Sequence, residues 1–125
     1  MTQKTVLSVG QCRPDTATIS QYLTTEFGAK VMTADLLADT LQVLESQSVD
    51  LVLINRKLDA DDSDGMEILK QIRANQAMVS IPVMLVSNFP EWQEKAVLLG
   101  ATYGFGKAEL NRPETKQRLS AILEA

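Results

Sequence analysis

The stretch Asp50-Leu-Val-Leu-Ile-Asn55 decides the fold, because four consecutive apolar residues stand between two polar ones. A run of apolar residues without alternation is typical of a strand that is buried on both faces, as in a parallel sheet. Successive parallel strands need a crossover connection between them, and this is usually a helix. We therefore expect the chain on either side of this stretch to alternate between helices and strands.

The rest of the chain has this alternation. Short apolar segments that suit strands lie at residues 6–9, 31–34, 81–86 and 103–105. Between them, apolar residues recur at intervals of three or four, as on one face of a helix; these stretches lie at residues 19–27, 37–44, 66–72, 92–99 and 119–123. Asn111-Arg-Pro-Glu114 resembles a capping box and is expected to begin the last helix. The expected fold class is α/β: a doubly wound (βα)5 domain, with a five-stranded parallel sheet and helices on both faces.

The length and composition limit the function. With 125 residues the chain has the size of one domain, so residues 1–125 are expected to form a single domain without an output domain. The sequence contains no His, the commonest general base and metal ligand, and its single cysteine, Cys12, excludes an internal disulfide. The net charge of −4 argues against nucleic-acid binding. No apolar run reaches the ~18 residues of a membrane span, so we expect no membrane association and a cytoplasmic location.

Four aspartates in the loop at residues 59–65 raise the alternative of a calcium site. The spacing does not fit, because placing Gly65 in the glycine position puts Ala60 and Gln71 in the first and last ligand positions. The loop is expected to be a solvated acidic segment. The sequence also lacks a Gly-rich nucleotide-binding motif, so we expect neither a metal site nor a cofactor. Cys12 has two interpretations, a reactive thiol favoured by nearby cations or a small filler.

Four segments, taken in order, resemble the receiver domain of bacterial two-component response regulators, and the resemblance covers essentially the whole chain. The stretch at residues 50–54 resembles the family's third strand, and Asp64-Gly65-Met-Glu-Ile-Leu resembles one of its helix starts. Ile81-Pro-Val-Met-Leu-Val-Ser87 resembles its fourth strand and hydroxyl residue, and Gly100-Ala101 followed by Lys107 resembles its last signature. The resemblance implies a flavodoxin-like receiver topology. It also implies a role in phosphorelay signal transduction as a signalling protein and not as an enzyme.

An active receiver resembling this chain needs two carboxylates that bind Mg²⁺, a phosphoaccepting Asp after its third strand, and a hydroxyl residue and a Lys that stabilise the phosphoryl oxygens. Here Gly10 and Gln11 stand at the positions of the acidic pair, and Asn55 stands at that of the phosphoacceptor. Ser87 and Lys107 are retained. Since Mg²⁺ prefers charged oxygen ligands and a carboxamide is a poor nucleophile, the chain resembles the degenerate pseudo-receivers, or atypical response regulators. Asn55, Gln11, Ser87 and Lys107 are expected to converge at one edge of the sheet.

The family's partner-binding face is formed by the fourth helix, the fifth strand and the fifth helix. Gly104 stands where the family has a switching aromatic residue on the fifth strand. Gly104 and Gly106 flank Phe105, so this strand is expected to be locally compliant. On this face we expect Trp92, Leu98 and Phe105 to contact a protein partner in a signalling pathway. A homodimer is an alternative.

The leading hypothesis is therefore a receiver-like module that acts through protein–protein interaction independently of phosphorylation. Two alternatives remain open. One is a receiver that is switched by non-covalent binding of an anion or small molecule at Ser87 and Lys107. The other is phosphorylation of an unconventional residue such as Asp59 or Ser87.

Overall fold

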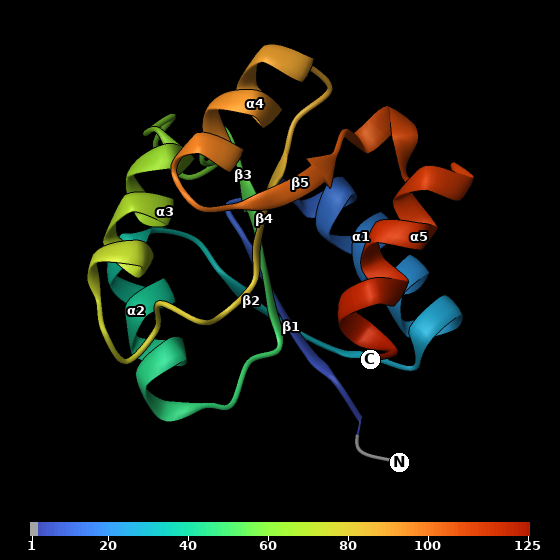
Figure 1. The fold of residues 1–125 in the computed structure, drawn as a ribbon, viewed down its shortest axis with the longest axis horizontal. Helices are drawn as coiled ribbons and strands as arrows, with labels where there is room; N and C mark the ends of the chain where they lie inside the picture. The colour runs from blue at the N-terminus through green and yellow to red at the C-terminus, as the bar shows by residue number, and fades with distance from the viewer. Residues whose placement is uncertain (1–2) are drawn as a thin grey trace.

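The computed structural model describes residues 3–125, and within them lies one sheet of five parallel strands (Figure 1). The strand order is β2-β1-β3-β4-β5. β2 therefore lies on one side of β1, and β3, β4 and β5 follow in turn on the other side. This is the expected doubly wound (βα)5 fold, which is confirmed. The elements are β1 (Thr5–Val9), α1 (Arg13–Phe27), β2 (Lys30–Ala34), α2 (Leu37–Ser46), β3 (Leu51–Asn55), α3 (Gly65–Ala74), β4 (Val83–Val86), α4 (Pro90–Leu98), β5 (Thr102–Phe105), the 3-10 turn η1 (Lys107–Glu109) and α5 (Pro113–Leu123).

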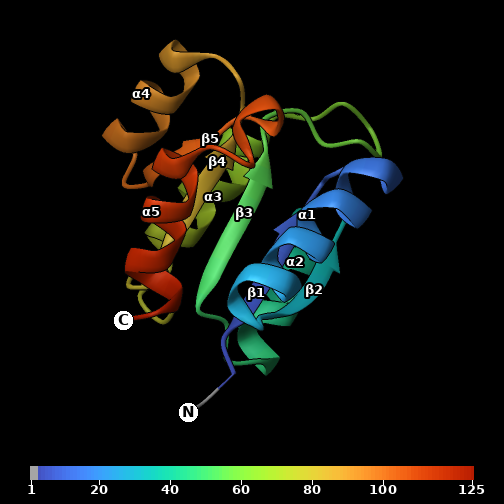
Figure 2. The ribbon, with the colours of Figure 1, turned by 90° about the vertical axis from the view of Figure 1, so that its right-hand side faces the viewer.

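Helices cover both faces of the sheet, and each face has its own apolar cluster. α1 and α5 pack on one face, where Ile19 and Leu119 join Val6 of β1. α2, α3 and α4 pack on the other, where Ile68 and Ala96 are among the buried residues. Figure 2 shows α5 and α1 on the same side of the sheet, with β3 visible between them in this view. No helix in this part of the chain combines the length and the apolar character needed to cross a membrane.

β3 lies in the middle of the sheet, between β1 and β4. Its apolar residues 51–54 are each at most 1% exposed, because helices cover both faces of a parallel sheet. Asn55 is the last residue of the strand and the first that is only partly buried. The decisive stretch of the sequence therefore leads directly to an accessible polar side chain at the carboxyl edge of the sheet.

The last helix does not begin as expected. α5 begins at Pro113 with Arg112 in the N-cap position, and no side chain caps it. The expected capping box at Asn111 is therefore wrong. The reason is that the chain first forms η1, whose start is closed by a hydrogen bond from the Gly106 N–H to the Glu109 carboxylate at 2.8 Å. Pro113, as the first residue of α5, lacks one of the four N–H groups that are left unpaired at a helix start.

β5 carries a bulge next to Gly104. Between two paired positions, β5 has two residues, Tyr103 and Gly104, where β4 has only Leu85. A Cβ atom on Gly104 would collide with the carbonyl oxygen of Leu85. Glycine is therefore required here because the two backbones approach each other closely, as is common at bulges.

The side chain of Gln93 on α4 fills the gap beside this bulge. Its amide nitrogen donates to the carbonyl oxygens of Leu85 and Ser87 at 2.9 and 3.1 Å, and its amide oxygen accepts from the Gly104 N–H at 2.8 Å. Gln93 is only 2% exposed, so water competes little for these bonds. They tie α4 to both β4 and β5.

Candidate functional site

The carboxyl ends of β3, β4 and β5 bring three of the predicted site residues together. Asn55 ends β3, Ser87 follows β4 directly, and Lys107 follows β5 after one residue. All three line one hollow of about 340 Å³. Arg56 and Lys57 line it as well. The hollow therefore combines amide and hydroxyl groups with three basic side chains.

The side chain of Asn55 is hydrogen-bonded to the backbone. Its amide nitrogen donates to the carbonyl oxygen of Gly10 at 3.1 Å. The same oxygen accepts from the Asp59 N–H at 3.0 Å. Gly10 has a φ of +73°, in the left-handed region that favours glycine. In this conformation the Gly10 carbonyl oxygen accepts two hydrogen bonds, one from the Asn55 side chain at the end of β3 and one from the backbone of the loop that follows β3.

Gln11 does not join this cluster, so the expected convergence is wrong for this residue. Its side chain lines a different hollow, beside α1, and is only 8% exposed. Its amide nitrogen is 3.4 Å from the carbonyl oxygen of Val9. Because the chain turns at Gly10, the residue that follows it points to the other side of β1.

The ammonium group of Lys107 forms an ion pair with Asp15 in the first turn of α1, at 2.6 Å. The thiol of Cys12 donates to the same carboxylate oxygen at 3.0 Å. These two contacts, the Cys12 hydrogen bond first, hold the pKa of Asp15 below its ordinary value of 3.8. Sequence reasoning missed Asp15; the only available signal was an acidic residue three positions after the loop cysteine.

The loop that follows β4 is also tied to the chain beyond β5. The Ser87 hydroxyl oxygen accepts from the Phe89 N–H at 3.3 Å. The Asn88 side-chain oxygen accepts from the Ala108 N–H at 3.1 Å. Side chains on the β4–α4 loop therefore hold both the start of α4 and the segment that carries Lys107.

Arg56 connects the hollow to α4. Its guanidinium lies 3.7 Å from the Asp64 carboxylate and 3.9 Å from the centre of the Trp92 ring. The Lys95 ammonium lies 4.4 Å from the same ring. Such stacking of cations on an aromatic face is favourable. Trp92 is thus partly buried between α4 and the loop after β3, and it also packs against the core cluster of that face.

The predicted partner residues have different environments. Leu98 is 86% exposed, whereas Phe105 is 0% exposed and belongs to the core between α1, α5 and the sheet. The prediction that Phe105 contacts a partner is therefore wrong, because the bulge in β5 turns its side chain inward. Tyr103, which sequence reasoning missed, is exposed in its place and stacks under the Arg118 guanidinium at 4.7 Å.

The exposed apolar side chains concentrate near α4. Within residues 3–125, six large apolar or aromatic side chains are exposed, and four of them belong to β5, to α4 or to the residue before it. These four are Phe89, Val97, Leu98 and Tyr103.

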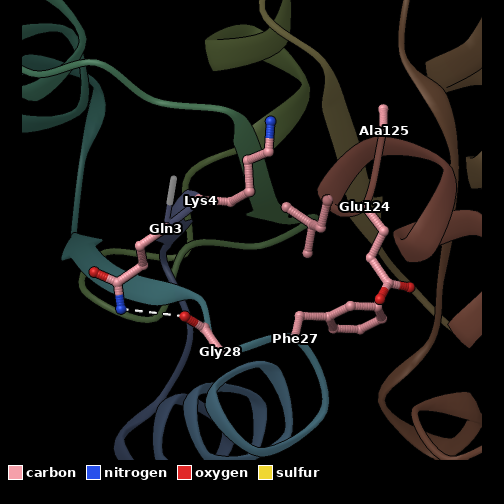
Figure 3. Close-up of a pocket in the computed structure, with 7 residues that line it drawn as sticks. Gln3, Lys4, Phe27, Gly28, Glu124 and Ala125 are labelled. Carbon is pink, nitrogen blue, oxygen red and sulfur yellow. Dashed lines mark hydrogen bonds between the residues drawn. The ribbon is translucent and has the colours of Figure 1, made fainter. Parts of the chain in front are cut away.

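Another hollow lies at the opposite, amino-terminal edge of the sheet (Figure 3). It is lined by residues before β1, by the turn after α1 and by the end of α5. The Gln3 side chain donates to the Gly28 carbonyl oxygen across it at 3.1 Å. This hollow holds none of the predicted site residues. Over residues 3–125, no three His, Cys, Asp or Glu side chains gather closely enough to hold a metal ion.

The comparisons with known proteins agree on one family. The model of the response regulator receiver domain matches residues 13–121. No curated protein matches the sequence significantly. Among solved structures, the chain is similar to the receiver domain of a DNA-binding response regulator from Colwellia psychrerythraea, with 23% identity, a TM-score of 0.82, and coverage of 98% of this chain and 100% of that one.

Two further solved structures have the same fold. One is a chemotaxis protein from Vibrio cholerae, with 20% identity, a TM-score of 0.73 and coverage of 98% of each chain. The other is the receiver domain of a sensor histidine kinase from Pseudomonas aeruginosa, solved with magnesium in its active-site cleft. It has 17% identity, a TM-score of 0.74, and coverage of 99% of this chain and 100% of that one.

Proposed function

Because the chain belongs to the response regulator receiver family of two-component signalling, we propose that it is a degenerate receiver that docks on a partner protein without control by aspartyl phosphorylation. The observation that carries this proposal is the position and the hydrogen bonding of the Asn55 side chain. Its carboxamide occupies the end of β3 and donates to the Gly10 carbonyl oxygen. In this account residues 1–125 form one receiver domain.

The chemistry of phosphoryl transfer supports the proposal. A nucleophile must attack phosphorus, and cations must offset the charge that develops on the phosphoryl oxygens. A neutral carboxamide whose nitrogen already donates to Gly10 is a poor candidate for the first role. Lys107 is held by Asp15 at 2.6 Å, so its charge is already neutralised by a partner from α1.

The residues after β1 do not fit a Mg²⁺ ion. Mg²⁺ prefers octahedral coordination by hard oxygen atoms, usually with one or more carboxylates. Gly10 offers only a carbonyl oxygen that already accepts two hydrogen bonds. The Gln11 side chain lines a different hollow. We therefore derive no step of the function through a metal ion.

The proposed docking face consists of α4, β5 and the residues that flank them. It is supported by the four exposed side chains Phe89, Val97, Leu98 and Tyr103, because exposed apolar residues that gather on one face are typical of interaction sites. The Gln93 bonds hold α4 against β4 and β5. In this account the face keeps one conformation and is ready to bind at all times. Phe105 is excluded as a contact because it is buried.

Incubation with acetyl phosphate and Mg²⁺ tests the proposal. Intact-mass analysis should show no phosphoryl group on the wild-type protein, and a phosphoaccepting receiver treated in parallel serves as positive control. The Asn55→Asp variant should also label poorly, since the nucleophile returns but the metal ligands do not. A phosphoryl group on wild-type Asp59 or Ser87 would contradict the proposal and favour an unconventional acceptor.

The docking face has its own test once a purified partner is available. Leu98→Asp should weaken binding by about tenfold, or about 1.4 kcal/mol. Leu36→Asp is the matched control, because Leu36 is also an exposed apolar residue but lies just before α2. Equal effects of the two substitutions would place the interface elsewhere.

A second candidate function is non-covalent switching by an anion. It is favoured by the three basic side chains that line the hollow of Asn55 and Ser87, of which Lys57 forms none of the ion pairs found among residues 3–125. Titration with inorganic phosphate and with beryllofluoride, followed by amide NMR, separates the candidates. Saturable shifts at residues 55–57, 87 and 107 would favour the switch.

A further inference from the structure

A hollow of about 560 Å³ lies between the start of α2, the loop after β3 and the first turn of α3. Its wall is mainly apolar. It shares no lining residue with the hollow of Asn55 and Lys107. It also contains none of the four exposed side chains that mark the proposed docking face on α4 and β5. This hollow is therefore a separate surface of the molecule.

The apolar wall that a ligand can reach belongs to α2 and to the residue before it. Leu36 is 36% exposed and Ala38 is exposed, while Leu37 and Leu41 are partly buried. Leu37 and Leu41 are four residues apart and so lie on the same face of α2. The side chain of Leu58 is 2% exposed and only closes the floor. Exposed apolar side chains beside an apolar hollow are typical of interaction sites.

Leu36 has an unusual position for a leucine. It is the N-cap residue of α2, and this position favours small polar side chains and disfavours leucine. The N–H groups of Asp35 and Leu36 each donate to one oxygen of the Asp39 carboxylate, both at 2.7 Å. The backbone at Leu36 is therefore held in place, while its side chain neither caps the helix nor belongs to a core cluster. Such a local mismatch is expected where a residue serves binding.

The rim of the hollow is acidic. Asp61, Asp64 and Glu67 line it, and no basic side chain does. Asp61 takes part in none of the ion pairs found over the described residues. Asp64 lies 3.7 Å from Arg56, and Glu67 lies 3.1 Å from Lys70. Because these two pairs are accessible to solvent, they are weak, and the cations of a ligand can compete for both carboxylates.

The acidic character extends over this whole part of the chain. Residues 31–69 contain nine acidic and two basic side chains, whereas the remaining residues contain seven acidic and ten basic ones. α2 itself contains no Lys or Arg. A basic protein segment is therefore attracted to this surface, and nucleic acids and anionic membranes are repelled from it.

We propose that this hollow is a docking site for a basic amphipathic segment of a second partner protein, whose apolar side chains contact Leu36, Leu37 and Leu41 and whose Lys or Arg side chains pair with Asp61 and Glu67. An apolar centre with a charged rim is the common anatomy of protein interfaces, and an amphipathic helix that lies in a groove is a recurring form of it. The site is independent of the docking face on α4 and β5. A partner bound to that face does not contact Leu36, and the two surfaces allow the protein to join two partners.

Amide NMR titration of the whole chain tests the site with three synthetic amidated peptides. The first contains only Leu and Lys, with the Leu residues spaced to lie on one face of a helix. The second carries Glu in place of Lys, and the third carries Ser in place of Leu. The Leu/Lys peptide should give saturable shifts at residues 36–41 and 61–67 in low salt. The other two should bind at least tenfold more weakly, because one lacks the opposite charge and the other lacks the apolar face.

Leu36→Ser tests the apolar contact. It removes the exposed side chain and keeps the fold, because Ser is favoured at an N-cap. It should weaken binding of the Leu/Lys peptide about fivefold. Val79→Ser is the matched control and should leave the affinity unchanged, since Val79 is 50% exposed but lies between α3 and β4, outside the hollow.

Glu67→Gln tests the charged rim. It should weaken binding of the Leu/Lys peptide about threefold in low salt and less in high salt. Glu114→Gln is the matched control and should have no effect, since Glu114 stands in the first turn of α5 as Glu67 stands in the first turn of α3.

Four results would overturn the proposal. The first is a Leu/Lys peptide that does not saturate the shifts below about 1 mM. The second is a Leu/Glu peptide that binds as tightly, or shifts that are confined to residues 89–103. The third is a Leu36→Ser variant that binds the Leu/Lys peptide as well as wild type does. The fourth is a chain that sediments alone as a dimer and that Leu36→Ser makes monomeric, because the occupant of the hollow is then a second copy.

Discussion

The backbone of Leu58 lies against Gly10: a Cβ atom on Gly10 would be 3.2 Å from the Leu58 Cα atom and would collide with the Leu58 side chain. Leu58 is 2% exposed and belongs to the core cluster of α2 and α3. The loop after β3 has therefore folded an apolar residue over the end of β1. The space above Gly10 is therefore filled by Leu58.

Gly10→Ala should lower the free energy of unfolding by about 3 kcal/mol, from about 1–2 kcal/mol for a left-handed non-glycine residue and a further 1–3 kcal/mol for overpacking. Gly28→Ala is the matched control, since Gly28 has a similar φ of +62° but no atom within 4 Å of its added Cβ. It should cost only the conformational part, about 1 kcal/mol. Urea unfolding measures both, and equal losses would mean that Leu58 does not restrict position 10.

The same contact affects any attempt to rebuild a metal site. Gly10→Asp should be at least as destabilising as Gly10→Ala, because the added side chain is larger and begins at the same crowded Cβ position. Combining it with Asn55→Asp and Gln11→Asp should therefore give an unstable protein. Simple restoration of the acidic residues is not expected to restore phosphorylation.

Gln93→Leu should lower the free energy of unfolding by about 3 kcal/mol, because it leaves two carbonyl oxygens and the Gly104 N–H without their buried partner. Hydrogen exchange at Gly104 should become faster at the same time. Glu94→Leu, on the exposed side of the same helix, is the control and should change stability by no more than about 0.5 kcal/mol. Unchanged exchange at Gly104 in Gln93→Leu would show that α4 is not held to β5 by this side chain.

The alternation of strands and helices could be predicted because it depends on local patterns. Residues 51–54 are apolar on both faces of a strand, and this indicates a central parallel strand whatever the rest of the chain does. The orientation of Phe105 could not be predicted, because one extra residue in β5 reverses which side chains face the core. Gln93, which bonds to both strands beside the bulge, is a polar residue on a helix, and the local pattern does not indicate its burial.

The hydrogen-bond and ion-pair partners of the site residues could also not be predicted from the sequence. Asp15 and Lys107 are 92 residues apart in sequence, and only the packing of α1 beside the end of β5 brings them to 2.6 Å. Gln11 directly follows Gly10, and the positive φ of Gly10 sets the direction in which the chain continues after β1. The type of each residue indicates what its side chain can do chemically, whereas the three-dimensional fold determines which groups it contacts.

Asp15 should give the protein a measurable dependence of stability on pH. Its pKa is lowered in the folded protein by Cys12 and Lys107, so its carboxylate stabilises the fold above its ordinary pKa of 3.8 and this stabilisation is lost as the pH falls through the folded pKa. The free energy of unfolding of wild type should therefore fall more steeply below about pH 4 than that of Asp15→Asn. The side chain is partly exposed, so the difference should be small and should shrink in high salt. Parallel pH curves at low salt would contradict the pairing.

Arg73 should be one of the most important polar side chains for stability. Its guanidinium donates to the carbonyl oxygens of Gly100, Val79 and Ile81 at 2.9, 3.1 and 2.9 Å. It thereby joins the end of α3 to the turns before β4 and β5. Burial lowers the pKa of Arg73, but an arginine remains charged throughout the physiological range. Its loss would free three carbonyl oxygens in two loops at once.

Arg73→Met should therefore lower the free energy of unfolding by about 2 kcal/mol, since hydrogen bonds to a charged group are stronger than neutral ones and part of the loss is recovered from water. Arg73→Lys should recover less than half of this, because a single ammonium cannot reach three carbonyl oxygens with the geometry of a planar guanidinium. Lys70→Met on the same helix is the control, as its ion pair with Glu67 is exposed and should be worth no more than about 0.5 kcal/mol. Urea unfolding measures all three variants. If Arg73→Met is no less stable than Lys70→Met, the two loops are held by their apolar contacts and not by the guanidinium.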